Sequence, residues 1–326
     1  MTKSRPADVF LLSSPRTLSN LFLKLLSGQA GWEESTYFVH DAHHYAQHHF
    51  DKCDLESPAE MLQEYLGKLR AGYQGMLTAR ENAHENNHAI FLKSHIIHIT
   101  SPWQVYSSFK RGVYPPETFV QLETSLSALP RTNPTMLSDE MLLSFVPIFI
   151  IRHPALVVDS YYRARAFTGA ADLLQSTTPL STGARLTKAL FCWYMAATDA
   201  RPAAATAPET GPLPGRKAYP IIVDADDILE GDTMQRLASV IGIDPERIPQ
   251  QWEARSTGGL EPRKKRFVGD LWESTGIDRS KGSKSLDLEA KFNSWNESYG
   301  LEVGKLLADL ANSHMEDYLW LKSRKF

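Results

Sequence analysis

The chain of 326 residues has little cysteine, little net charge and no long apolar run. Its two cysteines, Cys53 and Cys192, are too few for a disulfide framework, so we expect reduced thiols in a cytoplasmic protein. The net charge of −3 excludes a general attraction to nucleic acid or to an anionic membrane surface. No run reaches about 18 apolar residues, and the N-terminus lacks the apolar core of a signal peptide. We therefore expect no membrane partner.

Helical and strand-like patterns alternate along the chain, which favours an α/β fold with a central, mostly parallel sheet flanked by helices. Short apolar runs predict strands at 8–13, 89–93, 146–151 and 219–224. Apolar spacing predicts helices at 18–28, 57–82, 102–110, 136–143, 154–165, 183–200, 232–241 and 286–313. The helix at 183–200 is apolar enough to be buried. We expect one domain over residues 1–326, with a flexible, proline- and alanine-rich loop at 201–217.

A hydroxyl-rich turn joins the first predicted strand to the first predicted helix. It reads Ser13-Ser14-Pro15-Arg16-Thr17-Leu18-Ser19-Asn20. A helix N-terminus presents unpaired N–H groups and the positive end of the helix dipole, and an arginine beside it strengthens an anion site. Residues 8–26 contain no glycine, so this turn is not a Walker A loop. An ordinary strand-to-helix turn capped by a hydroxyl is the alternative.

A second candidate anion site follows the strand at 146–151. Arg152 stands at the end of that strand, Pro154 then opens a helix, and Ser160 lies about one and a half turns into it. An arginine at the carboxyl end of a parallel strand faces the crevice in which α/β folds bind ligands. A surface arginine in an ion pair is the alternative.

Together these two segments resemble the sulfotransferases that use 3′-phosphoadenosine 5′-phosphosulfate (PAPS). The family's first turn reads roughly P-[KR]-[ST]-G-[ST]-[ST], and its second motif reads R-[ND]-P followed by a serine six residues after the proline. By this resemblance Arg152 and Ser160 would hold the 3′-phosphate. The resemblance also implies a three-layer fold like that of P-loop NTPases. The residues that would hold the 5′-phosphosulfate are Arg16, Thr17, Leu18, Ser19 and Asn20.

Two further segments match the same family in the same order. The strand ending in Lys93-Ser94-His95 resembles K-[TS]-H, in which the lysine contacts the transferring group and the histidine is the general base. The run 263–272 resembles the loop R-K-G-x-x-G-D-W, which covers the 3′-phosphate. By resemblance this loop would contribute Lys264, Lys265 and Arg266.

The chain departs from the family pattern at four positions. Leu18 replaces a glycine, so we expect a turn that avoids positive φ. Leu21 and Ala225 stand where a tryptophan and a tyrosine often contact the adenine, and Arg266 replaces a loop glycine. The phosphate contacts are therefore better matched than the adenine contacts.

The resemblance implies transfer of a sulfuryl group from PAPS to a hydroxyl or amine of a small molecule. The transferring group carries one negative charge, so Arg16 and Lys93 would stabilise it without a metal ion. His95, which titrates near neutrality, would take the proton of the acceptor. Aromatic residues at 37–50 and 102–119 are candidates to line an apolar acceptor pocket.

Alternatives stay open at this point. One is a P-loop-type kinase or hydrolase, with Asp224 as a Walker B carboxylate on Mg²⁺. Another is a sulfotransferase-fold protein with altered or lost transfer activity. His40, His44 and His48 have helical spacing that can bind zinc, but a substrate-lining or solvated face is the favoured interpretation. Residues 263–266 fit an anion clamp better than a nucleic-acid patch, and a homodimer is an open option.

Overall fold

The computed structural model describes residues 6–26, 28–49, 59–102, 105, 131–175, 177–199 and 219–326. The loop predicted at 201–217 and nearly all of the helix predicted at 102–110 lie outside the described residues. The same holds for most of the aromatic residues between 102 and 119. These predictions stay predictions.

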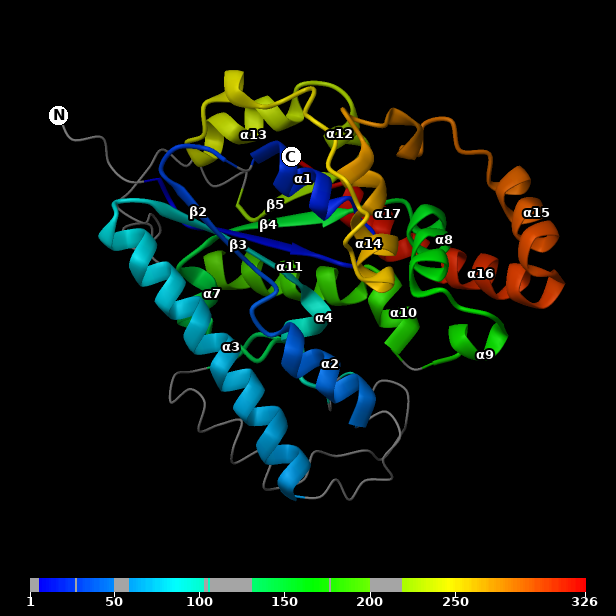
Figure 1. Cartoon of the computed structure of the whole chain (residues 1–326), viewed down its shortest axis with the longest axis horizontal. Helices are drawn as coiled ribbons and strands as arrows, with labels where there is room; N and C mark the ends of the chain where they lie inside the picture. Colours follow the sequence, from blue (N-terminus) through cyan, green and yellow to red (C-terminus); the bar gives the residue numbers. More distant parts are fainter. Residues whose placement is uncertain are drawn as a thin grey trace. The chain divides into compact units, whose positions relative to one another are not determined.

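The centre of the fold is an all-parallel sheet of five strands flanked by helices (Figure 1). The strands follow the order β2-β3-β1-β4-β5. Their bounds are Val9–Ser13 for β1, Trp32–Thr36 for β2, Ala89–His95 for β3, Val146–Ile151 for β4 and Ile221–Asp224 for β5. The strands β1, β4 and β5 are buried along their whole length. Such continuous apolar runs are typical of parallel strands covered on both faces, and the predicted α/β class is confirmed.

The strand β2 was not predicted from the sequence. Its residues, Trp-Glu-Glu-Ser-Thr, are exposed or half-buried. It stands at the end of the strand order and pairs in parallel with β3, with Trp32 opposite Ala89. An edge strand buries little surface, so neither an apolar run nor a clean alternation marks it in the sequence.

The residue contacts divide the chain into two compact units, each carrying part of the sheet. The first unit comprises 1–12, 30–148 and 186–220, and the second comprises 13–29, 149–185 and 221–326. The expected single domain stays a prediction.

In the first unit, the long helix α3 (Ala59–Glu85) packs against α2 (His40–His49) and against β3. The apolar positions of α3 at Leu62, Tyr65, Leu66, Leu69 and Met76 are buried, as the predicted helical spacing requires. The remaining helices of this unit are α4 (Ile96–Ile99), α7 (Asp139–Leu143) and α11 (Arg185–Asp199).

The helix α11 corrects one prediction. We expected a buried helix at 183–200, and Leu190, Phe191 and Tyr194 are indeed buried. Cys192 is exposed, however, and the side chain of Met195 is 39% exposed. Only one face of this helix reaches the core, so some of its apolar residues, such as Met195, stay exposed.

The second unit is mostly helical. Its shorter elements are α1 (Ser19–Leu26), α9 (Ala170–Leu173), α10 (Thr177–Thr182), α12 (Ala225–Leu229), α13 (Thr233–Ile241), α17 (Met315–Lys322) and two 3₁₀ helices, Pro245–Arg247 and Arg279–Lys281. Its longer helices are α8 (Pro154–Arg165), α14 (Pro262–Glu273), α15 (Leu288–Tyr299) and α16 (Leu301–Ser313). The helices α8, α15 and α16 pack together (Figure 1). They enclose a core cluster that contains Ala155, Val158, Trp295 and Leu307.

The predicted single helix over 286–313 is wrong, because the chain breaks at Gly300. This glycine has φ 83°, a left-handed conformation that an L side chain rarely adopts. It ends α15 through its N–H, which donates to the carbonyl of Asn296 at 3.0 Å, and α16 begins at the next residue. The apolar spacing continues on both sides of this glycine, so the sequence pattern predicted a single helix. Within the described ranges, no helix has the length and apolar character needed to cross a membrane.

Candidate functional site

The turn between β1 and α1 belongs to the second unit from Ser13 onward. Ser14 donates its hydroxyl to the carbonyl of Gly183 at 2.8 Å, and Thr17 donates its hydroxyl to the carbonyl of Ser14 at 2.9 Å. Ser19 is buried, and the first bond of α1 runs from Phe22 N–H to the carbonyl of Leu18. These hydroxyls stabilise the turn itself, so the predicted cradle is a well-ordered piece of backbone.

The expectation that this turn avoids positive φ is wrong. Leu18 has φ 64° and Arg16 has φ 67°. Both residues therefore adopt the left-handed conformation that glycine normally supplies at such a turn. The backbone path that the family pattern predicts is kept, although the residue that usually permits it is absent. Such strain persists only where the surrounding contacts enforce it, and it is frequent at functional sites.

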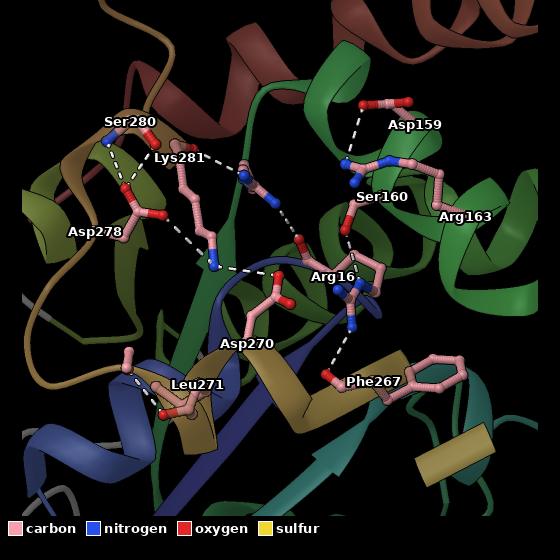
Figure 2. A network of polar contacts seen from close by, with 12 residues as sticks. Arg16, Asp159, Ser160, Arg163, Phe267, Asp270, Leu271, Asp278, Ser280 and Lys281 are labelled. Atoms are coloured by element: carbon pink, nitrogen blue, oxygen red, sulfur yellow. Dashed lines mark hydrogen bonds and ion pairs between the residues drawn. The ribbon is translucent and has the colours of Figure 1, made fainter. Parts of the chain in front are cut away.

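The side chain of Arg16 links three segments of the second unit. Its Nε donates to Ser160 Oγ on α8 at 2.8 Å, and a terminal nitrogen donates to the carbonyl of Phe267 on α14 at 2.9 Å. Its guanidinium also lies 5.4 Å from the centre of the Phe267 ring. Figure 2 shows Arg16 directed toward Ser160 and Phe267. The sequence assigned Arg16 and Ser160 to opposite ends of a nucleotide, whereas here the two side chains touch.

Arg152 follows β4 and anchors the same network. Its two terminal nitrogens donate to the carbonyl of Arg16 at 2.9 Å and to the carbonyl of Lys281 at 2.8 Å. It is 9% exposed, and its buried Nε has no hydrogen-bond partner among the described residues. Pro154 stands at the first position of α8, as predicted, and His153 caps the helix by accepting from Ala155 N–H.

The electrostatics of this network favour an anion. Burial, together with the charges of Arg16 and Arg163, lowers the pKa of Arg152 to about 10, while Asp226 and Asp159 oppose the shift. Asp159 is engaged by Lys291 at 2.8 Å and by Arg163 at 3.2 Å. Arg16 donates to a hydroxyl and a carbonyl, and Arg152 donates to two carbonyls. A bound phosphate would relieve this repulsion.

The predicted clamp loop at 263–272 is a helix, which is a second correction. It begins with Glu261, whose carboxylate accepts from the N–H groups of Arg263 and Lys264, followed by Pro262 at the first helical position. A capping side chain followed by proline is an ordinary helix start, and the family resemblance hid it. The helix is α14, and it supplies the Phe267 carbonyl to Arg16.

The three predicted phosphate residues of this segment lie on α14. Arg266 donates its Nε to the carbonyl of Ala164 at 3.2 Å, near the end of α8. Lys264 is exposed and lies 5.9 Å from the centre of the Trp272 ring, and Lys265 is exposed. Burial, together with the charge of Arg165, lowers the pKa of Arg263. Basic side chains thus gather along one stretch of α14 and the end of α8.

Lys93 and His95 belong to the first unit and lie on β3, as predicted. Lys93 is fully buried, and burial lowers its pKa to about 7, opposed only by Glu34. Its Nζ lies 4.9 Å from the centre of the Tyr37 ring. The hydroxyl of Tyr37 lies 3.3 Å from His95 Nε2. The two predicted catalytic residues therefore share one neighbour, which sequence reasoning missed because β2 itself was missed.

Asp224, the predicted Walker B carboxylate, has a structural role. Asp224 is 1% exposed, caps α12 by accepting from Asp226 N–H at 3.0 Å, and accepts from the Tyr318 hydroxyl at 2.9 Å. Lys322 lies 3.6 Å away. The carboxylate that the kinase or hydrolase alternative needs for Mg²⁺ is thus used to join β5 to α12 and α17. Across the described ranges, no group of three or more His, Cys, Asp or Glu side chains is arranged to hold a metal ion.

Comparison with known proteins finds two similar sulfotransferases over the full length of the chain. The chain is 27% identical over 341 residues to the sulfotransferase ppzF of Metarhizium majus (strain ARSEF 297), covering 98% of this chain and 97% of that protein. The ppzF sulfotransferase of Metarhizium rileyi (strain RCEF 4871) is 27% identical over 343 residues, covering 98% and 96%. This full-length similarity supports a divergent member of the sulfotransferase family. No protein-family model matches it.

Solved structures similar to this sulfotransferase are distant. One is the sulfotransferase domain of the olefin synthase of Synechococcus PCC 7002, with a TM-score of 0.43, 15% identity and 95% of each chain covered. Another is the sulfotransferase domain from the curacin biosynthetic pathway, with a TM-score of 0.42, 16% identity and coverage of 95% of this chain and 98% of that one.

Proposed function

We propose that this sulfotransferase moves a sulfuryl group from PAPS to a hydroxyl of a small molecule. The observation that carries the proposal is the contact between Arg16 and Ser160, with Arg152 donating to the Arg16 carbonyl. Residues named from two separate motifs, far apart in the sequence, thus meet within hydrogen-bonding distance. A chance match of short motifs would give no reason for such a meeting.

The residues of the second unit fit a nucleotide phosphate. Arg152 has a buried Nε without a partner in the described part of the chain, and its pKa is lowered by burial and by Arg16. Planar guanidinium groups bind phosphate through paired hydrogen bonds. In the proposal, Arg152, Ser160 and the end of α14 hold the 3′-phosphate. Arg16 belongs to the turn that would hold the 5′-phosphosulfate and also donates to Ser160, so in the proposal it serves both ends of the donor.

Lys93 and His95 perform the chemical part of the proposal. Both stand at the carboxyl end of β3, which neighbours β1 in the parallel sheet. With a pKa of about 7, Lys93 is only partly protonated at neutral pH. An approaching sulfonate raises that pKa, so the lysine becomes positively charged when the sulfonate is bound. His95 accepts the proton that the acceptor hydroxyl loses, a contribution typically worth about 10² to 10⁴ in rate.

The acceptor is proposed only as a small molecule with a hydroxyl or amine, with an apolar or aromatic body. The support is the group of rings beside His95, which includes Tyr37, His40 and His98. Aromatic walls with a few polar groups are typical of small-molecule pockets. Location in the cytoplasm and self-association stay predictions.

The test is transfer of radiolabelled sulfate from PAPS to a panel of phenols and aliphatic alcohols. We expect the wild-type chain to label at least one acceptor, and His95→Ala to keep nucleotide binding while losing labelling by at least about 10². The matched control is His88→Ala, which removes a half-buried histidine that pairs with Glu33 at 2.9 Å. Wild-type rates in the His95 variant would remove the base assignment. Mg²⁺-dependent ATP hydrolysis instead of sulfate transfer would favour the kinase or hydrolase alternative.

A further inference from the structure

Tyr37 contacts both residues that the proposed function uses for transfer. It directly follows β2, and its N–H donates to the carbonyl of Lys93 at 2.8 Å. Its ring centre lies 4.9 Å from Lys93 Nζ, and its hydroxyl lies 3.3 Å from His95 Nε2. The backbone, the ring and the hydroxyl of Tyr37 therefore contact, in turn, the Lys93 carbonyl, the Lys93 ammonium and the His95 ring.

The backbone of Tyr37 is held in an unusual conformation. Its φ is 57°, which is uncommon for a bulky residue and persists only under external constraint. His40 N–H donates to the Tyr37 carbonyl at 2.9 Å, at the start of α2. On α3, Gly72 lies so close to the carbonyl of Phe38 that no Cβ would fit there. These contacts fix the direction in which the Tyr37 side chain leaves the backbone.

His98 forms a neutral wall beside this pair. Its ring centre lies 5.7 Å from Tyr37 and 5.1 Å from His95. Burial lowers the pKa of His98 well below its ordinary value, and the neighbouring His43, His95 and His40 lower it further. His98 Nδ1 has no hydrogen-bond partner in the described part of the chain. His98 therefore stays uncharged at neutral pH and does not compete with His95 for the proton.

The chemistry of the two groups decides which one donates. A phenol with a pKa near about 10 is a far stronger acid than the N–H of a neutral imidazole, and an imidazole nitrogen is the better acceptor. Neutral His95 therefore accepts from Tyr37 at Nε2, and its own proton is on Nδ1. The lone pair that makes His95 a base is the one already engaged by Tyr37.

We propose that Tyr37 is a catalytic residue that passes the acceptor's proton to His95. The inference rests on the proposed function. As the bond between the acceptor oxygen and sulfur forms and the bond from sulfur to the phosphate oxygen breaks, the acceptor's proton moves to the Tyr37 oxygen. The proton already on that oxygen moves to His95 Nε2 in the same step. Tyr37 is neutral before and after, and His95 ends as the imidazolium.

Kinetics of Tyr37→Phe with PAPS and either phenol or benzyl alcohol test this relay. The variant keeps the ring beneath Lys93 and removes only the hydroxyl. We expect kcat to fall by at least about 10², with unchanged KM for the acceptor and unchanged affinity for adenosine 3′,5′-bisphosphate (PAP). The control is Tyr73→Phe, which removes a hydroxyl from a half-buried tyrosine of α3 and should keep wild-type rates. A wild-type kcat in Tyr37→Phe would overturn the relay.

The tautomer of His95, read from nitrogen NMR shifts of the imidazole ring, is an independent measurement. We expect Nδ1–H in the wild type and a shift toward Nε2–H, the form preferred in water, in Tyr37→Phe. A wild-type His95 that already carries its proton on Nε2 would contradict the proposal. If neither alcohol is labelled by the wild type although the tautomer shifts as expected, the proposed function fails and the hydrogen bond between Tyr37 and His95 stands.

Discussion

Arg16 Nε donates to Ser160 Oγ at 2.8 Å, although the two residues are separated by 144 positions in the chain. The bond joins the turn after β1 to the second turn of α8. Arg152 fastens the same turn from the other side through the Arg16 carbonyl. The two motifs are thus joined by hydrogen bonds, so we expect mutations in them to have coupled effects on nucleotide affinity.

Nucleotide affinity should show coupling between Arg16 and Ser160. Arg16→Lys keeps the charge and loses the forked geometry, and we expect it to weaken PAP binding about tenfold, or about 1.4 kcal/mol. Ser160→Ala should cost a similar amount. The double variant should lose less than the sum, because each single change already breaks the shared bond. Calorimetric titration measures the cycle, with Ser313→Ala, a hydroxyl bonded only to its own helix, as the control. Full additivity would contradict the coupling.

Lys93 should destabilise the folded chain at neutral pH. Its pKa falls from 10.5 unfolded to about 7 folded because of burial. Between these values the unfolded chain binds more protons, so stability rises with pH through this window, by up to about 1.4 kcal/mol per pH unit. Lys93→Met should therefore stabilise by roughly 2–4 kcal/mol at pH 7, and by less at pH 9, while abolishing transfer.

Urea unfolding at the two pH values measures this effect. The control is Lys68→Met on α3, whose lysine is partly exposed and pairs with Glu64. We expect it to change stability by no more than about 0.5 kcal/mol at either pH. A stability gain for Lys93→Met that does not shrink as the pH rises would contradict the lowered pKa.

At Leu18 we expect the glycine variant to be more stable than the alanine variant, which is the reverse of the usual order. At φ 64° a side chain costs about 1 kcal/mol, so Leu18→Gly should be more stable than Leu18→Ala by that amount. The matched control is Leu23, half-buried inside α1, where the glycine variant should be the less stable by about 1 kcal/mol. Thermal unfolding of the four variants measures the stability difference between glycine and alanine at position 18 and at position 23. An alanine variant as stable as the glycine variant at position 18 would contradict the strained turn.

Asp8 should be a stability residue of the first unit with no part in transfer. It is buried, pairs with Arg80 at 2.8 Å and His84 at 2.9 Å, and accepts from Ile90 N–H at 3.1 Å. Asp8→Asn removes the buried carboxylate that pairs with the half-buried Arg80, so we expect a loss of about 3 kcal/mol. Burial raises the pKa of Asp8, but the Ile90 bond and the Arg80 charge lower it overall.

The sign of this shift gives a pH dependence for Asp8. Because the folded pKa lies below the unfolded value, the stabilisation is present above pH 3.8 and disappears as the pH falls through the folded pKa. Acid unfolding of the wild type and Asp8→Asn should therefore converge at low pH. Asp41→Asn, which changes an aspartate with a 93% exposed side chain, is the control. A constant difference down to the lowest pH would contradict this account.

The sequence predicted the buried parts of the fold well. The strands β1, β4 and β5 and the first four residues of β3 are apolar runs, and the helix α8 opens with proline, so local pattern and final structure agree. The edge strand β2 and the break at Gly300 were missed. An edge strand buries too little to leave an apolar pattern, and a glycine in the middle of an apolar period acts only through its backbone.

The candidate site was predicted in part, for a physical reason. Motifs name side chains, so Arg16, Ser160, Lys93, His95 and Arg152 could be singled out. The carbonyls of Phe267 and Lys281, which orient two arginines, have no sequence signature, because every residue carries a carbonyl. The helical state of α14 was hidden by a family pattern that describes a loop, although Glu261 and Pro262 marked its start.

The central claim is that the arginine network of the second unit binds a nucleotide bearing a 3′-phosphate. Calorimetric titration of PAP into the wild type, Arg152→Met and Arg279→Met tests it most directly, since Arg279 is an exposed arginine outside the network. We predict low-micromolar binding by the wild type and by Arg279→Met, and at least about tenfold weaker binding by Arg152→Met. No heat from the wild type at millimolar PAP, or equal affinity in all three proteins, would contradict the account.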